Sequence, residues 1–195
     1  ALLVIARLNS SRLPNKNILE INKKPMIINL VERLSKSNFL DKIIICTSNE
    51  KTDDPLEIIA KQNNVNIFRG SLNNIMNRII ECANYYNITD IVEILGDNPL
   101  INHELLDYVL EDYIKNKQDY STNISLDYKK QLQQNTHKCF PIGLRVQVYK
   151  KKIAEDYINF ENYDFISTHP TSFIFENPKK YKINFLEANK SWSFL

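Results

Sequence analysis

Residues 2–17 read LLVIARLNSSRLPNKN, and this stretch decides the fold. Its first five residues are all apolar, which is typical of a strand that is buried on both faces of a parallel sheet. The polar residues 7–17 follow directly and contain three cations, Arg7, Arg12 and Lys16. A buried strand that runs into a polar loop predicts an α/β fold, with this loop at the carboxyl edge of the sheet.

The same alternation continues along the next hundred residues. Four apolar segments are typical of strands: 2–6, 43–46, 66–68 and 91–95. Each is followed by a segment in which apolar residues recur at helical spacing: 25–34, 55–62, 73–86 and 103–115. Asn102 is expected to cap the last helix. Right-handed crossovers would bring the loops after the strands to one edge of a mainly parallel sheet with helices on both faces.

The rhythm changes beyond Asp119. Residues 120–136 are polar and weakly periodic, which predicts an excursion or flap. Apolar and polar side chains alternate over 140–149 and predict a long strand, followed by a helix near 153–160 and a weak strand near 181–185. We find no repeat or linker, so we expect one domain over residues 1–195.

Composition excludes several classes of protein. A net charge of +2, with no basic run, argues against a nucleic-acid partner. The early apolar run 2–6 is too short for a signal sequence, and no segment is long enough for a membrane span. The cysteines Cys46, Cys82 and Cys139 lack metal-ligand spacing, which predicts reduced thiols in a cytoplasmic protein.

The first loop carries chemistry that suits a triphosphate. Arg7, Arg12 and Lys16 supply positive charge, and Ser10 and Ser11 supply hydroxyl donors. The alternative is a solvated loop with ordinary surface cations. The loop has no glycine, so it is neither a Walker A loop nor a dinucleotide fingerprint.

A second candidate site follows the strand at 91–95. Asp97 stands there in the sequence Gly96-Asp97-Asn98-Pro99, where a carboxylate can hold Mg²⁺ that bridges phosphate oxygens. Asp97 can equally cap the helix that starts after Asn102, and the sequence alone leaves both readings open. Asp53 and Asp54 most simply begin a helix, where the helix dipole favours negative charge. His103, His137 and His169 are too scattered for a zinc site.

These motifs together carry a family resemblance. The matching segments are 5–7, 10–14, Lys16, 24–27 and 96–100, with 68–71, Asn77-Arg78, Asn123, 140–144 and His169 at similar spacing. They resemble the cytidylyltransferases that activate 3-deoxy-manno-octulosonate, sialic-acid-like sugars and related saccharides, and they are most similar to the spore-coat-polysaccharide type.

The resemblance implies a fold, a reaction and a set of roles. It implies a glycosyltransferase-A-like, Rossmann-like three-layer α/β/α sandwich that joins CMP from CTP to a sugar or sugar acid, with Mg²⁺ as cofactor. Arg12 and Lys16 would hold the triphosphate and Asp97 the metal. Ala6 and Arg7 would lie near the base and ribose, and Arg78 would reach the nucleotide or the sugar. Family members are often dimeric, so a homodimer is a further expectation.

Some positions depart from the family pattern. Asn15 replaces a commoner glycine, and Asn77 stands where an aspartate usually precedes Arg78. Arg145 and Gln147 lie where related strands read Leu-Asp-Val-Glu. The family's second metal aspartate, in a Val-Asp motif near the C-terminus, is not found, which predicts that the sequence ends before it. Two alternatives therefore stay open: a sugar-1-phosphate guanylyl- or uridylyltransferase, and a nucleotide-binding protein without catalysis.

Overall fold

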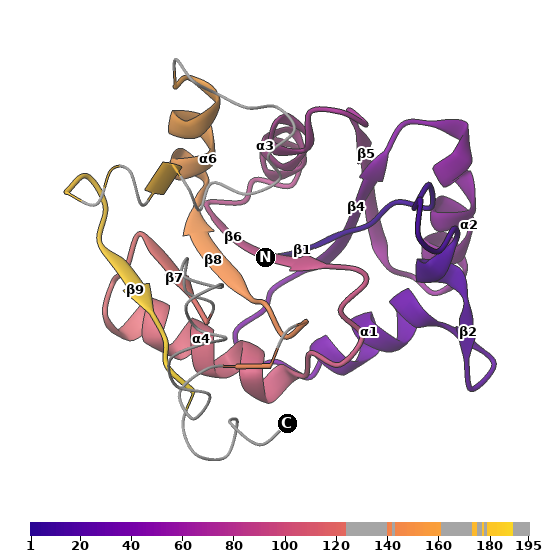
Figure 1. The fold of residues 1–195 in the computed structure, drawn as a ribbon, viewed down its shortest axis with the longest axis horizontal. Helices are drawn as coiled ribbons and strands as arrows, with labels where there is room; N and C mark the ends of the chain where they lie inside the picture. Colours follow the sequence, from indigo (N-terminus) through magenta and orange to yellow (C-terminus); the bar gives the residue numbers. More distant parts are fainter. Residues whose placement is uncertain (124–139, 142, 161–172, 175–176, 178, 189–195) are drawn as a thin grey trace.

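A seven-stranded sheet forms the centre of the molecule (Figure 1). The computed structural model describes residues 1–123, 140–141, 143–160, 173–174, 177 and 179–188. The strands, in their order across the sheet, are β5 (Asn66–Gly70), β4 (Ile43–Ser48), β1 (Leu2–Ile5), β6 (Asp90–Leu95), β8 (Gln147–Lys150), β7 (Tyr120–Thr122) and β9 (Ile183–Phe185). Only β8 runs antiparallel to its neighbours, so the mainly parallel sheet is confirmed.

Helices cover both faces of this sheet (Figure 1). One apolar cluster joins the sheet to α1 (Met26–Leu34), α2 (Asp54–Gln62) and α4 (His103–Lys115). A second cluster joins the other face to α3 (Ile75–Tyr85) and α6 (Lys151–Ile158). The three-layer α/β/α sandwich that the resemblance implied is therefore confirmed.

The first strand shows why the apolar run decides the fold. Leu2 and Val4 pack into the cluster of α1 and α4, whereas Leu3 and Ile5 pack into the cluster of α3. All four side chains are buried, and burial of such a side chain stabilises by about 1.5–3 kcal/mol. A strand with these residues is stable only between two layers of helices.

Most of the expected elements lie within two residues of the observed ones. Asn102 is the N-cap of α4, and its Oδ1 accepts a hydrogen bond from the Leu105 N–H at 3.0 Å. The expected helix near 153–160 is α6, which begins two residues earlier. Cys46 and Cys82 are free thiols, as predicted, while Cys139 lies outside the described residues. The described helices are all too short or too polar to cross a membrane.

Two expectations about the second half were wrong. Tyr120–Thr122 is the buried strand β7 and not the start of a polar flap; the rest of that segment, 124–136, lies outside the described residues. The long strand expected over 140–149 is only Gln147–Lys150. Before Gln147, the Asn123 side chain bonds Leu144 O and Val146 N, at 2.7 and 2.9 Å, in place of a strand backbone.

The sequence reading also missed a small hairpin after the first loop. It pairs β2 (Glu20–Ile21) with β3 (Lys24–Pro25), so Pro25 precedes α1 instead of lying in its first turn. The turn residues Asn22 and Lys23 have φ of 53° and 63°. The short 3₁₀ helices η1 (Lys16–Ile18) and η2 (Lys51–Asp53) complete this half of the chain.

Candidate functional site

A pocket of about 270 Å³ lies at the carboxyl ends of β1 and β6. Its lining comes from the first loop, the end of β6 and helix α3, and consists of Ile5, Ala6, Arg7, Ser10, Ser11, Arg12, Lys16, Asn17, Ile75, Arg78, Leu95 and Asp97. All eight residues that the sequence singled out are among them. The structure thus brings the predicted site residues together, and their individual roles remain predictions.

Leu8 organises the loop that forms one wall of the pocket. Its side chain is buried in the core, and its carbonyl oxygen accepts hydrogen bonds from Ser10 N at 2.9 Å and Asn15 N at 3.0 Å. Asn15 takes a left-handed conformation with φ of 59°. Asparagine is one of the few residues besides glycine that adopts this region readily. Asn15 can therefore replace the family's glycine without distorting the loop.

Lys16 and Asp97 form an ion pair across the pocket. Lys16 begins η1, and Asp97 follows β6, so the two sites predicted separately meet at one place. Both side chains are partly exposed, at 22% and 31%. Asp97 does not cap α4, because Asn102 fills that position. Of the two readings of Asp97, the structure supports a side chain that faces the pocket.

Arg78 contributes a buried cation to the lining of the pocket. It is 1% exposed, and its Nη1 donates to Ser71 O at 3.0 Å. Its Nε has no hydrogen-bond partner among the described residues. A Cβ on Gly70 would lie only 2.8 Å from the Arg78 Cγ, so the glycine leaves room for the arginine. An unmatched buried donor is costly, which makes Arg78 a candidate to bind an acceptor on a ligand.

Asn17 is a site residue that the sequence reading did not single out. It is 2% exposed, and its Nδ2 donates to Arg7 O at 2.9 Å. Its Oδ1 has no partner within the described part of the chain. Among the described residues that line the pocket, the Asn17 Oδ1 and the Arg78 Nε are thus both buried and without a hydrogen-bond partner. In the sequence, the only signal that could have identified Asn17 as a site residue was its position directly after Lys16.

The pocket is strongly positive. Four cations, Arg7, Arg12, Lys16 and Arg78, line it with the single carboxylate of Asp97. Within the described residues no cluster of three or more His, Cys, Asp or Glu side chains could hold a metal ion. A divalent cation here would take one ligand from Asp97 and the others from ligand oxygens and water. That donor set fits Mg²⁺, which often binds through one or two carboxylates and substrate phosphates.

A buried polar network lies between β6 and β8. Glu93 pairs in register with Gln147, and its carboxylate accepts from the Tyr149 hydroxyl at 2.7 Å. Gln147 Oε1 accepts from Tyr120 at 2.7 Å and from Arg145 at 2.9 Å. Complete burial and the adjacent Glu93 charge raise the pKa of Tyr149 well above its usual value. Arg145 and Gln147 thus take part in an internal network at positions where the family carries acids.

A larger cavity of about 460 Å³ lies at the opposite edge of the sheet. Its lining includes Ala1, Tyr86, Tyr113 and Gln118, and none of the predicted site residues. Open α/β sheets bind ligands at the carboxyl ends of their strands. We therefore take the smaller, cation-lined pocket as the candidate site.

Comparison with known proteins adds independent information. A family model described as Cytidylyltransferase matches residues 1–191. An uncharacterized protein of Methanocaldococcus jannaschii is 32% identical over 185 residues, which cover 95% of this chain and 70% of that protein. The spore coat polysaccharide biosynthesis protein SpsF of Bacillus subtilis is 27% identical over 191 residues, which cover 95% of this chain and 74% of SpsF.

Solved structures give the same picture. A cytidylyltransferase from Leptospira borgpetersenii superposes with a TM-score of 0.80 and 30% identity, over 97% of this chain and 77% of that one. The CMP:2-keto-3-deoxy-manno-octonic acid synthetase solved with CTP superposes with a TM-score of 0.71 over 96% of this chain and 88% of that one. At 15% identity, the second likeness concerns the fold alone.

Proposed function

The chain belongs to the cytidylyltransferase family, and from that premise we propose that it transfers CMP from CTP to a sugar or sugar acid and releases pyrophosphate. The observation that carries the proposal is the pocket at the ends of β1 and β6, where four cations and one carboxylate converge. A triphosphate needs such a concentration of positive charge. The name of SpsF further suggests an acceptor used in cell-surface polysaccharide or glycan synthesis.

Each part of the pocket has a proposed role. Arg12 and Lys16 bind the triphosphate, with Ser10 and Ser11 as donors to its oxygens. Ala6 and Arg7 lie near the base and ribose, while Arg78 donates to the nucleotide or the sugar. These assignments are supported by the position of all the side chains around one cavity.

The proposed reaction is a displacement at the α-phosphorus. The acceptor's hydroxyl oxygen forms a bond to that phosphorus, and the bond to the oxygen that bridges the α- and β-phosphates breaks. The electron pair leaves with pyrophosphate, and the hydroxyl proton is lost to solvent. Catalysis of this kind rests on positioning and on neutralisation of charge, without a covalent intermediate on the protein.

We propose Mg²⁺ as the cofactor, with Asp97 as the carboxylate of the pocket that would hold it. When bound, the ion would neutralise charge on the phosphate oxygens. Lys16 and Asp97 form an ion pair, and in this proposal Lys16 binds a phosphate oxygen while Asp97 would hold the ion.

Thermal unfolding with CTP, GTP, UTP or ATP, each with Mg²⁺, tests this proposal. A ligand at a hundred times its dissociation constant stabilises a protein by about 2.7 kcal/mol, which gives a visible shift in Tm. We expect a shift with CTP and, with a panel of sugars and sugar acids, release of pyrophosphate. A shift with GTP or UTP alone would favour a sugar-1-phosphate guanylyl- or uridylyltransferase. CTP binding without turnover on any acceptor would favour a binding protein that lacks catalysis.

A further inference from the structure

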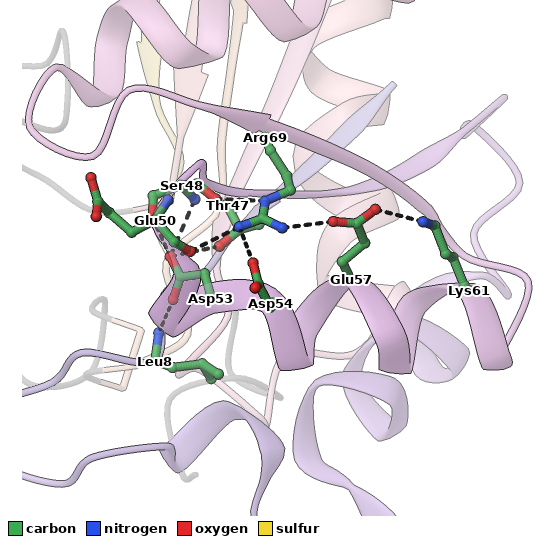
Figure 2. Close-up of polar contacts among 9 residues, drawn as sticks. All are labelled: Leu8, Thr47, Ser48, Glu50, Asp53, Asp54, Glu57, Lys61 and Arg69. Atoms are coloured by element: carbon green, nitrogen blue, oxygen red, sulfur yellow. Dashed lines mark hydrogen bonds and ion pairs between the residues drawn. The ribbon is translucent and has the colours of Figure 1, made fainter.

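Asp53 is a buried carboxylate that the start of a helix does not explain. It is 1% exposed, and as the residue before α2 it makes no side-chain capping bond. Its Oδ1 accepts from the Leu8 N–H at 2.7 Å. Its Oδ2 accepts from the Thr47 hydroxyl at 3.1 Å, the Ser48 N–H at 3.3 Å and the Ser48 hydroxyl. The earlier reading of Asp53 as a helix-start residue was incomplete, because its carboxylate reaches back to the first loop (Figure 2).

The bond to Leu8 replaces a missing step in the pairing of β1 with β4. The Leu2 N–H donates to Lys42 O and the Ala6 N–H to Cys46 O, so in this register the Leu8 N–H would meet Ser48 O. Ser48 O instead accepts from Arg69 Nε at 3.0 Å. The Asp53 carboxylate thus continues the hydrogen-bond ladder into the loop beyond the end of the strand.

The corner that carries Asp53 is itself held in place by Arg69 (Figure 2). Besides Ser48 O, Arg69 donates to Glu50 O at 2.8 Å and pairs with Asp54 at 2.7 Å and Glu57 at 2.6 Å. Partly exposed ion pairs contribute little stability by themselves. The two bonds from the planar guanidinium to the carbonyls of Ser48 and Glu50 are what fix the geometry of the corner.

Leu8 connects the Asp53 carboxylate to the loop that lines the pocket. Its carbonyl oxygen binds Ser10 N and Asn15 N, so the residue that Asp53 holds is the one around which the loop turns. Ser10, Arg12 and Lys16 all line the pocket from this loop. A loop that must order itself at the moment of binding loses affinity, whereas a preorganised loop does not.

We infer that Asp53 is the positioning residue of the nucleotide-binding loop, an inference that rests on the proposed function of the pocket. Asp53 contacts no ligand in this role. It holds the Leu8 backbone so that the cations and hydroxyls of residues 7–16 face the triphosphate before it arrives. The negative charge is essential to this role, because both oxygens of the side chain must accept hydrogen bonds. One oxygen faces the Leu8 N–H and the other faces three donors of Thr47 and Ser48, and only a carboxylate has two acceptor oxygens.

The test compares Asp53→Asn with Asp54→Asn. An asparagine offers one acceptor and places its NH₂ group against a backbone N–H, of either Leu8 or Ser48. Asp54→Asn removes a neighbouring carboxylate that pairs with Arg69 but does not contact the loop. At a temperature where both variants are fully folded, we expect Asp53→Asn to bind CTP at least tenfold more weakly and to exchange the Leu8 amide hydrogen at least tenfold faster. Asp54→Asn should stay within about twofold of the wild type in both measurements.

The outcomes separate this inference from the proposed function. A wild type that binds no nucleotide contradicts the function, while the Leu8 exchange rate still reports on the anchor. Asp53→Asn that is folded, binds CTP normally and protects Leu8 normally overturns the inference. Should Asp53→Asn fail to fold, Ser48→Ala replaces it. This variant removes the hydroxyl that donates to the Asp53 Oδ2, together with the bond that this hydroxyl accepts from the Glu50 N–H at 3.3 Å, and it keeps the acceptor of the Leu8 N–H. It should weaken CTP binding about threefold and speed Leu8 exchange, and no change in either would again overturn the inference.

Discussion

At the scale of single residues, the chemistry of the pocket centres on the pair of Lys16 and Asp97. Each neutralises the charge of the other in their ion pair. Partly exposed pairs of this kind stabilise a fold by about 0–1 kcal/mol, so neither residue is there for stability. Removal of one partner should therefore affect ligands far more than it affects folding.

We predict that Asp97→Asn loses Mg²⁺-dependent binding of CTP, with a Tm within a few degrees of the wild type. The amide keeps the size of the side chain but is a poor ligand for a hard divalent cation. Calorimetric titration of CTP with and without Mg²⁺ measures the effect. Glu32→Gln, which breaks the exposed pair with Lys24 outside the pocket, is the matched control. Unchanged Mg²⁺ dependence in Asp97→Asn would remove the metal assignment.

We predict that Lys16→Ala weakens CTP, UTP and GTP by similar factors, of about ten or more. A phosphate contact carries no information about the base, and one charge-assisted hydrogen bond contributes about 1.5–3 kcal/mol. Competitive titration against inorganic pyrophosphate gives the ranking, with Lys24→Ala as the surface control. A loss confined to CTP would place Lys16 beside the base and contradict the phosphate role.

The sequence predicted the site residues whose roles follow from nearby residues in the chain. It missed those whose roles depend on contacts between distant parts of the chain. Arg12 and Lys16 lie in the loop after β1, and Asp97 lies just beyond the end of β6, so the order of strands and loops alone places them at one edge of the sheet. Asp53 lies far from Leu8 in the chain, and its role depends on how β4 and the first loop diverge in space. Composition around Asp53 looks like any helix start, so no local signal distinguishes it.

At the scale of elements, the end of β6 and the first loop approach each other closely at Gly96. The Gly96 N–H donates to Ile5 O at 2.8 Å. A Cβ on Gly96 would lie 3.0 Å from the Ala6 Cβ and 3.4 Å from the Asn17 Oδ1. The glycine thus lets two strand ends and a buried amide meet beside the pocket.

We predict that Gly96→Ala lowers the free energy of unfolding by about 1–3 kcal/mol, as overpacking typically does. It should also weaken CTP binding, because relief of the contact moves either Ala6 or the Ile5 carbonyl, and both residues line the pocket. Urea unfolding and CTP titration give the two quantities. A variant with normal stability and normal affinity would show that this contact is not tight.

The far side of the sheet depends on Asp119, which joins β8 and β9. Its carboxylate pairs with Lys150 at 2.5 Å and accepts from the Lys182 N–H at 2.8 Å. Burial alone would raise the pKa of Asp119, but the bonds from Lys150 and Lys182 outweigh it and lower the pKa below its usual value. The folded protein therefore favours the charged form of this group.

A pH dependence follows from that direction. The charged Asp119 carboxylate stabilises the fold fully at any pH above its pKa in the unfolded chain, about 3.9. This stabilisation is lost as the pH falls through the lower pKa that Asp119 has in the folded protein. We predict that wild type exceeds Asp119→Asn in free energy of unfolding at pH 6, and that the gap narrows below about pH 4. Urea titrations of both proteins at pH 6 and pH 3 measure it. A gap of constant size would contradict the role of the charge.

Strands were predictable where their own residues form a strong hydrophobic pattern in the sequence. β1, β4 and β6 are buried on both faces and read as apolar runs. β7 is only three residues long. In the sequence, its buried residues Tyr120 and Ser121 therefore looked like the beginning of the polar segment that follows. The segment before β8 alternates between apolar and polar residues as a strand does. Its backbone, however, bonds the Asn123 side chain where a strand would bond a neighbouring backbone, and an alternation pattern cannot reveal such a side-chain contact.

At the scale of the whole molecule, charge is balanced overall and concentrated at one place. The chain carries 25 Lys and Arg residues and 23 Asp and Glu residues, a formal net charge of +2. Four of these cations share a pocket of about 270 Å³ with one carboxylate. The net charge argues against nucleic-acid binding, and the fold shows that the loop cations converge with Arg78 from helix α3.

This distribution predicts a selective effect of salt. The Debye length falls from about 10 Å at 0.1 M to about 3 Å at 1 M, so screening weakens an anion held by several partly exposed cations. We predict that inorganic pyrophosphate binds about three- to tenfold more weakly at 0.5 M than at 0.05 M NaCl, whereas the Tm without ligand changes little. Calorimetric titration at both concentrations measures the factor, and Lys16→Ala should reduce it because one of the cations is gone. Equal affinity at both salt concentrations would mean that pyrophosphate is not held by this group of charges, and the triphosphate would then have to bind elsewhere on the molecule.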